Sequence, residues 1–182
     1  MNNMKRNRIS KIVKAALVVM ALVVMGRAEA QQLTIPGTKV KYSFPSKWEY
    51  LSTHKIDANT QQYLYYYSAQ TIAANGDTTL PFLRIVVRKN YSKTVFDYVF
   101  ERYSMQPYQS LSDYTEGLGL PKAGGMGYIG AYTNLKDRRD YQFRMVYFKE
   151  QNTIVEFRLE TTHDTYPLME QEFENILKTL TF

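Results

Sequence analysis

The chain has 182 residues, with 23 Lys and Arg, 17 Asp and Glu, two His and no Cys. The absence of cysteine excludes a disulfide framework, a thiolate zinc site and a cysteine nucleophile. Two histidines are too few for a histidine-rich metal cluster or a proton relay. The hydrophobic fraction of 45% is that of a folded globular domain rather than of a disordered chain.

The first thirty residues have the pattern of a signal peptide. A basic head is followed by an apolar run from Ala15 to Met25 and by the small-residue step Ala28-Glu29-Ala30. The alternative, a membrane anchor retained as a short helix, needs an apolar run longer than these eleven residues. We therefore expect cleavage near Ala30, and one domain over residues 31–182 in the periplasm or outside the cell.

The leader also carries most of the excess positive charge. It holds six of the 23 Lys and Arg and one of the 17 Asp and Glu, which leaves 17 bases against 16 acids in the rest of the chain. The sequence pI of about 9.3 therefore does not indicate nucleic acid or an anionic membrane as a partner. An exported protein without cysteine is typical of a bacterial envelope.

Several segments after the leader have the composition and alternation of β-strands. Strands are expected over residues 40–44, 48–51, 62–68, 82–89, 126–134, 141–148 and 153–161. Asn75-Gly76 is a hairpin dipeptide, and it should turn the third of these strands back onto the fourth. Pro81, just before the fourth, indicates an edge strand or a bulge.

Alternation also assigns faces within the expected strands. Leu83, Ile85 and Val87 share one face of their strand. In the last strand Val155, Phe157 and Leu159 are expected to point inward, and the charged residues between them outward. Those outward residues are Glu156, Arg158 and Glu160.

Two segments have helical periodicity instead. Residues 95–103 follow a capping box formed by Thr94 and Asp97. The closing helix opens at Thr165 and Pro167, and its glutamates are expected to face water. Its expected buried stripe is Met169, Phe173, Ile176, Leu177 and Leu180. The fold class is therefore α+β, an antiparallel β-sheet flanked by helices.

Three landmarks resemble the PsbP fold. They are the strand, proline and tryptophan pattern from Tyr42 to Trp48, the long mid-chain helix after a hairpin, and the closing helix Tyr166 to Leu177 followed by Leu180-Thr181-Phe182. The group includes the photosystem extrinsic subunit, the Mog-type partner of the nuclear transport GTPase and DcrB-type envelope proteins. The resemblance implies an α/β/α sandwich and a non-catalytic module that docks on a larger assembly.

The sequence offers few motifs of catalysis or cofactor binding. The glycine string from Gly125 to Gly130 spells G-x-G-x-x-G, but a strand follows it where a dinucleotide site needs a helix. His54 with Asp57 and His163 with Asp164 are the only neighbouring His and carboxylate pairs, and neither has a third partner in the sequence. We expect no catalytic residue, no metal ligand and no cofactor.

Two sets of residues are candidates for binding. Tyr63, Tyr65 and Tyr67 lie on one strand face, where they either cover a half-buried sheet or form an exposed platform for a sugar or a protein. The glycine-rich stretch 117–127 carries Leu118, Leu120 and Met126, which either tuck under the sheet or order on a partner.

The function that fits these features best is an exported, cofactor-free accessory protein that binds another protein of the cell envelope. It is not an enzyme in this interpretation, and it has no membrane span once the leader is removed. The first alternative is a glycan-binding module that uses the tyrosine face. The second is a hydrolase whose site the sequence does not reveal.

Overall fold

The structure, a computed structural model, describes residues 32–44, 47–69, 71–72, 76, 78–103, 110–113 and 125–182. The elements in chain order are β1 (Gln32–Thr34), β2 (Lys41–Ser43), β3 (Trp48–Lys55), β4 (Thr60–Tyr67), β5 (Thr71–Ile72), β6 (Thr78–Thr79), β7 (Phe82–Arg88), α2 (Val95–Tyr103), β8 (Ser110–Asp113), β9 (Met126–Asn134), β10 (Arg139–Glu150), β11 (Thr153–Thr162) and α3 (Tyr166–Lys178).

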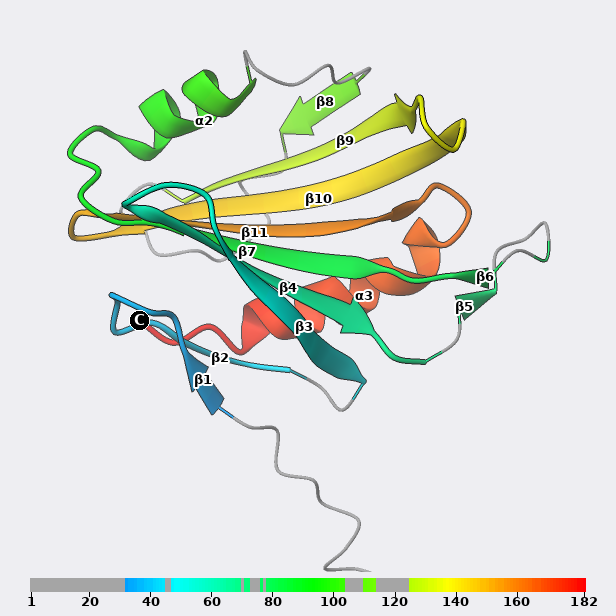
Figure 1. The fold of residues 1–182 in the computed structure, drawn as a ribbon, viewed down its shortest axis with the longest axis horizontal. Coiled ribbons are helices and arrows are strands. Elements are labelled where there is room, and N and C mark those ends of the chain that lie inside the picture. Colours follow the sequence, from blue (N-terminus) through cyan, green and yellow to red (C-terminus); the bar gives the residue numbers. More distant parts are fainter. Residues whose placement is uncertain are drawn as a thin grey trace, which may run out of the picture. The chain divides into compact units, whose positions relative to one another are not determined.

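Seven of these strands form one antiparallel sheet in the order β3-β4-β7-β11-β10-β9-β8 (Figure 1). Strands β1 and β2 pair with each other, as do β5 and β6. The short β5–β6 pair stands between β4 and β7 in the chain, and Gly76 within it has a φ of 84°. That left-handed conformation is one glycine adopts without strain, as expected of a turn.

The structure corrects the expectation of an edge strand after Pro81. Strand β7 lies in the middle of the sheet, between β4 and β11. Pro81 precedes the first residue of β7, so its missing N–H removes no hydrogen bond from the strand ladder. Its carbonyl accepts a hydrogen bond from the Tyr67 N–H at 3.0 Å.

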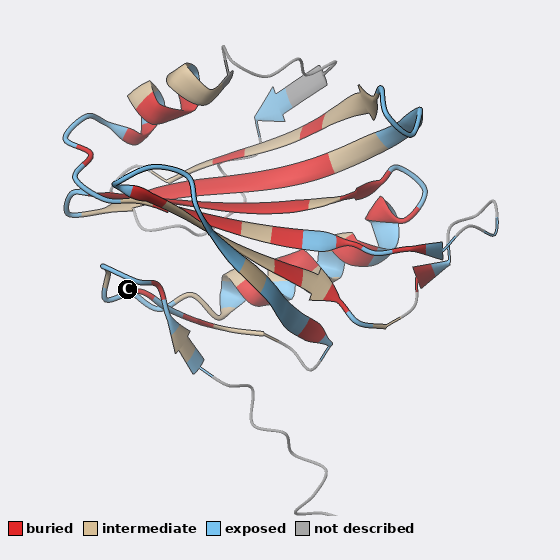
Figure 2. Cartoon of the chain, viewed as in Figure 1, coloured by how far each residue is buried: buried red, intermediate tan, exposed pale blue. Residues whose placement is uncertain are grey.

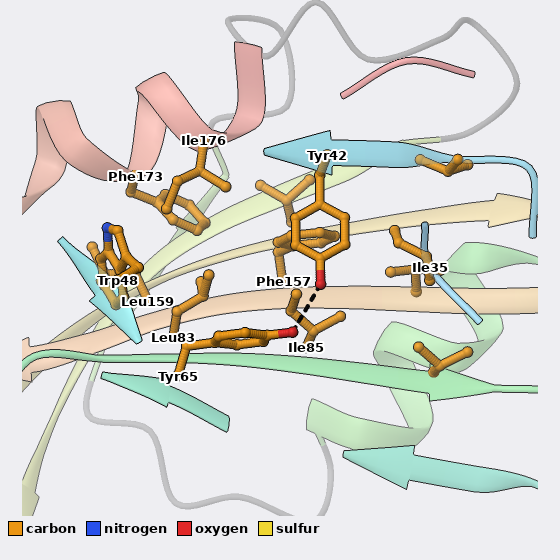
Figure 3. Packing of buried hydrophobic residues seen from close by; sticks show 14 of the residues in the cluster. Ile35, Tyr42, Trp48, Tyr65, Leu83, Ile85, Phe157, Leu159, Phe173 and Ile176 are labelled. Carbon is orange, nitrogen blue, oxygen red and sulfur yellow. Dashed lines mark hydrogen bonds between the residues drawn. The ribbon is translucent and has the colours of Figure 1, made fainter. Parts of the chain in front are cut away.

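One face of the sheet packs against α3 and the β1–β2 pair. The side chains of Leu83, Ile85 and Val87 belong to this core, as their alternation predicted. From α3, Met169, Phe173 and Ile176 are buried there, while Leu177 and Leu180 are half-buried at its border. Figure 3 shows Phe173 and Ile176 reaching down from α3 toward the strands.

The other face of the sheet carries α2 on part of its area. The capping box forms, because the Asp97 N–H donates to Thr94 Oγ1 at 3.1 Å and the Thr94 N–H donates to Asp97 Oδ2 at 2.9 Å. Val95, Tyr98 and Val99 then pack against residues of β10 and β11. Figure 2 shows the buried residues gathered on β7, β11 and β10, and exposed ones along the edge strand β3.

These layers confirm the α+β class, with helices on both faces of an antiparallel sheet. The glutamates of α3 differ from the expectation that they face only water. Glu170 and Glu174 contact the buried Arg144 of β10, at 3.1 and 3.0 Å from its Nη1. Neither helix in the described part of the chain has the length and apolar character needed to span a membrane.

Candidate functional site

The structure buries most of the tyrosine face of β4. Tyr65 and Tyr67 are each 7% exposed, and Tyr63 is half-buried. The hydroxyls of Tyr65 and Tyr42 are 2.9 Å apart in the core under β2 (Figure 3). An exposed tyrosine platform is therefore not formed by Tyr65 and Tyr67, because the β1–β2 pair and α3 cover this face. They cover a sheet face, which is the alternative that strand-forming tyrosine favours.

The second set of candidates is only partly described. Leu118 and Leu120 lie outside the described residues. Met126 is the first residue of β9, is half-buried and packs against the cluster beneath α2. In this position it is a packing residue of the sheet.

The other motifs take positions without a site. Gly127 and Gly130 lie within β9 and are buried, so the glycine string is a strand and not a phosphate-binding loop. His54 and His163 are both exposed, on the edge strand β3 and after β11. No group of three or more His, Asp or Glu in the described residues is placed to hold a metal ion.

A depression of about 260 Å³ lies on the sheet face that α2 covers in part. It opens over β4, β7 and β11, and we call it the Arg84 depression. Its lining residues are Leu64, Phe82, Arg84, Arg158 and Glu160. The strand register explains this grouping, because Leu64, Arg84 and Arg158 are directly opposite one another on three adjacent strands. Phe82 and Glu160 form the next opposite pair on the same face.

Glu160 is fully occupied within this site. Its Oε2 lies 2.5 Å from Nη2 of Arg158, and its Oε1 accepts a hydrogen bond from the Tyr132 hydroxyl at 2.8 Å. Burial, and then the charge of Glu160, raises the pKa of Tyr132 well above its ordinary value, so this hydroxyl keeps its proton. Arg158 also lies over the Phe143 ring, 4.6 Å from its centroid.

Arg84 has no such partner among the described residues. Its Nε is buried and makes no hydrogen bond. Glu160, the one carboxylate among the described lining residues, is already held by Arg158 and Tyr132. A guanidinium cannot lose its proton in a protein, so Arg84 brings an uncompensated positive charge to the depression.

A second group of charges lies beside the depression, under α2. Glu156 is 1% exposed, and its Oε2 lies 3.6 Å from Nε of Arg102 on α2. The guanidinium of Arg88 lies over the rings of Tyr91 and Tyr98, 5.0 and 6.0 Å from their centroids. Burial, and then the charge of Glu156, raises the pKa of Tyr98.

Alternation predicted the direction of these charged residues but not their burial. Glu156 and Arg158 were expected to point outward, and the structure shows that both are nevertheless buried. They do point away from the apolar core, as alternation requires, yet that opposite face is itself covered where α2 and Phe143 lie. Alternating arginines on two expected strands, Arg84 on one and Arg158 on the other, were the signal that marks this face.

The described residues that line the depression supply donors and apolar surface, and none of them is suited to proton transfer. Its arginines stay protonated, and its single carboxylate has both oxygens engaged. Arginine forks and aromatic side chains are typical of recognition sites, where they pair with carboxylates and cover apolar groups. The arrangement is suited to binding an anionic group.

Comparison with solved structures finds similar folds. A protein from Bacteroides thetaiotaomicron VPI-5482 has a TM-score of 0.52 and 14% identity over 84% of this chain and 48% of that one, so this chain spans about half its length. A mutant of the protein Mog1 has a TM-score of 0.53 and 8% identity over 84% and 95% of the two chains. A cyanobacterial PsbP from Synechocystis sp. PCC 6803 has a TM-score of 0.44 and 12% identity over 85% and 93%.

The fold that the chain shares with Mog1, at a TM-score of 0.53, is the PsbP-like fold that the landmarks in the sequence indicated. At these identities the likeness concerns the fold alone. No protein-family model matches the chain, and no curated protein matches it.

Proposed function

We propose that this protein is an exported, non-catalytic accessory protein that docks on another component of the cell envelope through the Arg84 depression. One observation carries the proposal. Arg84 has no partner among the described residues, and it lies at the same opening as apolar side chains. Phe82 is 37% exposed at this site. A folding argument gives no reason to keep a charge without a partner beside exposed aromatic surface, whereas recognition of a partner does.

Export is the part of the proposal that comes from residues 1–30. The leader pattern supports a domain in the periplasm or outside the cell, with cleavage after Ala30. The measurement is the intact mass of the exported protein, which should begin at Gln31. A species that keeps residues 1–30 in the membrane fraction contradicts export.

Docking is tested by placing a photo-crosslinking amino acid at single positions in cells. Phe82 lies at the depression, and Leu135, which is 89% exposed in the turn between β9 and β10, is the control position. We expect crosslinks to one envelope component from position 82 and none to that component from position 135. Equal crosslinking from both positions, or crosslinking from position 135 alone, places the contact elsewhere and contradicts the proposal.

A further inference from the structure

We propose that the Arg84 depression binds a carboxylate that adjoins an apolar group, and that this carboxylate pairs with the outer nitrogens of the Arg84 guanidinium. The inference rests on the proposed function and deepens it, because it assigns a chemistry to the group that the docking partner presents.

The charge at the depression favours an anion with a single negative charge. Arg84 and Arg158 are directly opposite each other on β7 and β11, and among the described residues Glu160 is the only carboxylate that lines the depression. Glu160 neutralises Arg158, with which it is in contact. One positive charge is left at Arg84, and a monoanion neutralises it without bringing a second negative charge toward Glu160.

The donors that Arg84 offers have the geometry of a carboxylate partner. Its Nε is buried. Its two outer nitrogens make no hydrogen bond to a described residue, and they are not buried as Nε is. Both therefore reach solvent at the depression. Two parallel Nη–H groups match the two oxygens of a carboxylate, and such bidentate pairs are short and strong.

The apolar side chains decide what the carboxylate is attached to. Leu64 lies opposite Arg84 on β4, and Phe82 lies two residues before Arg84 on the same face of β7. A ligand that carries only charged oxygens leaves the apolar surface of Leu64 and Phe82 in water. An aromatic or aliphatic group beside the carboxylate buries that surface. The site therefore fits an acidic residue beside an apolar one on the docking partner.

The first test is a calorimetric titration of the cleaved domain with phenylacetate, with its neutral analogue phenylacetamide and with inorganic phosphate. Phenylacetate should bind with a Kd on the order of 1 mM, as suits a ligand of this size. Phenylacetamide and phosphate should each bind at least about tenfold more weakly, because one lacks the charge and the other the apolar group. Equal binding of phenylacetate and phenylacetamide contradicts the proposal that the site recognises a carboxylate.

The second test removes the proposed partner of the carboxylate. Arg84→Gln should weaken phenylacetate binding about tenfold or more, and Arg138→Gln, the same change at an exposed turn, should leave it unchanged. Circular dichroism of both variants checks that each remains folded. If Arg84→Gln is folded and binds as well as Arg138→Gln does, the assignment to Arg84 is wrong.

Two peptides distinguish a protein source from a free acid. A short capped peptide with adjacent phenylalanine and glutamate is compared with the same peptide carrying glutamine. Tighter binding of the acidic peptide than of phenylacetate supports a protein segment as the occupant, and tighter binding of phenylacetate than of the acidic peptide contradicts it. If acid and amide forms bind alike while crosslinking from position 82 persists, the carboxylate is refuted and the proposed docking stands.

Discussion

Arg84 on β7 and Arg158 on β11 are directly opposite each other in the sheet, although only Arg158 contacts the carboxylate of Glu160. Like charges at opposite positions of an antiparallel pair destabilise it. The sheet therefore contains an arrangement that lowers its own stability, at the place where an apolar depression opens. Such a conflict between stability and local sequence is typical of functional sites.

The first prediction follows from this pair. Arg84→Gln should raise the free energy of unfolding by about 0.5–1 kcal/mol, because it removes one of two like charges that face each other and keeps a polar side chain. Urea denaturation of the cleaved domain measures the change. Arg138→Gln should stay within about 0.5 kcal/mol of the parent, as is usual for surface changes. A loss of more than about 1 kcal/mol in Arg84→Gln would show that Arg84 supports the fold.

The second prediction concerns the closing helix. Phe173 on α3 is fully buried, whereas Leu168 on the same helix is 63% exposed. Phe173→Ala should lower the free energy of unfolding by about 3–5 kcal/mol, since it leaves a cavity in the core between α3 and the sheet. Leu168→Ala should change it by less than about 0.5 kcal/mol. Similar effects of the two variants in thermal denaturation would mean that α3 is not docked through this stripe.

The third prediction concerns the start of α2. Thr94→Ala removes both hydrogen bonds that the Thr94 hydroxyl shares with Asp97, one to its N–H and one to its carboxylate. The loss should be about 1 kcal/mol, and amide hydrogen exchange in α2 should accelerate more than in β11. Thr94→Ser keeps the hydroxyl and should restore slow exchange. Unchanged exchange in Thr94→Ala would contradict the cap.

The fourth prediction concerns alkaline pH. Burial, and then the hydrogen bond to Tyr65, raises the pKa of Tyr42 far above its ordinary value of 10.0. The folded protein therefore keeps Tyr42 neutral above pH 10, while the unfolded chain ionises it. The stability that this tyrosine contributes is complete below about pH 10 and is lost as the pH rises further.

Each such tyrosine should lower the free energy of unfolding by about 1.4 kcal/mol per pH unit above pH 10. Tyr42→Phe should reduce the slope of that decline by the contribution of one tyrosine. At neutral pH it should lower the free energy of unfolding by about 1 kcal/mol, because the hydrogen bond to Tyr65 is lost. Denaturation curves at several pH values between neutral and strongly alkaline measure both effects. Parallel declines in parent and variant would show that Tyr42 ionises in the folded state.

Periodicity predicted most of the fold. The side chains of Leu83, Ile85 and Val87 share a face in the structure, and Met126–Asn134 is a strand with the bounds that its pattern indicated. Each of these depends on local alternation, which the chain carries within a few residues. The capping box of Thr94 and Asp97 was equally readable, because it also lies within one turn.

The candidate site was not predicted, because it depends on which faces are covered. Alternation separated Arg158 from Phe157, but it contained no information on the neighbour that would bury the arginine. The same limit applies to Tyr65, whose side of the sheet is closed by β2 and α3. The position of Arg84 opposite Arg158 depends on the pairing of strands about 70 residues apart in the chain, which no local pattern encodes.

The measurement that tests the central claim most directly is the yield of the crosslink from position 82 to its envelope component in cells, compared between the parent protein, Arg84→Gln and Arg138→Gln. A docking surface centred on Arg84 predicts that the yield falls about tenfold or more in Arg84→Gln and stays at the parent level in Arg138→Gln, with all three proteins exported in equal amounts. A yield that is the same in all three contradicts the claim.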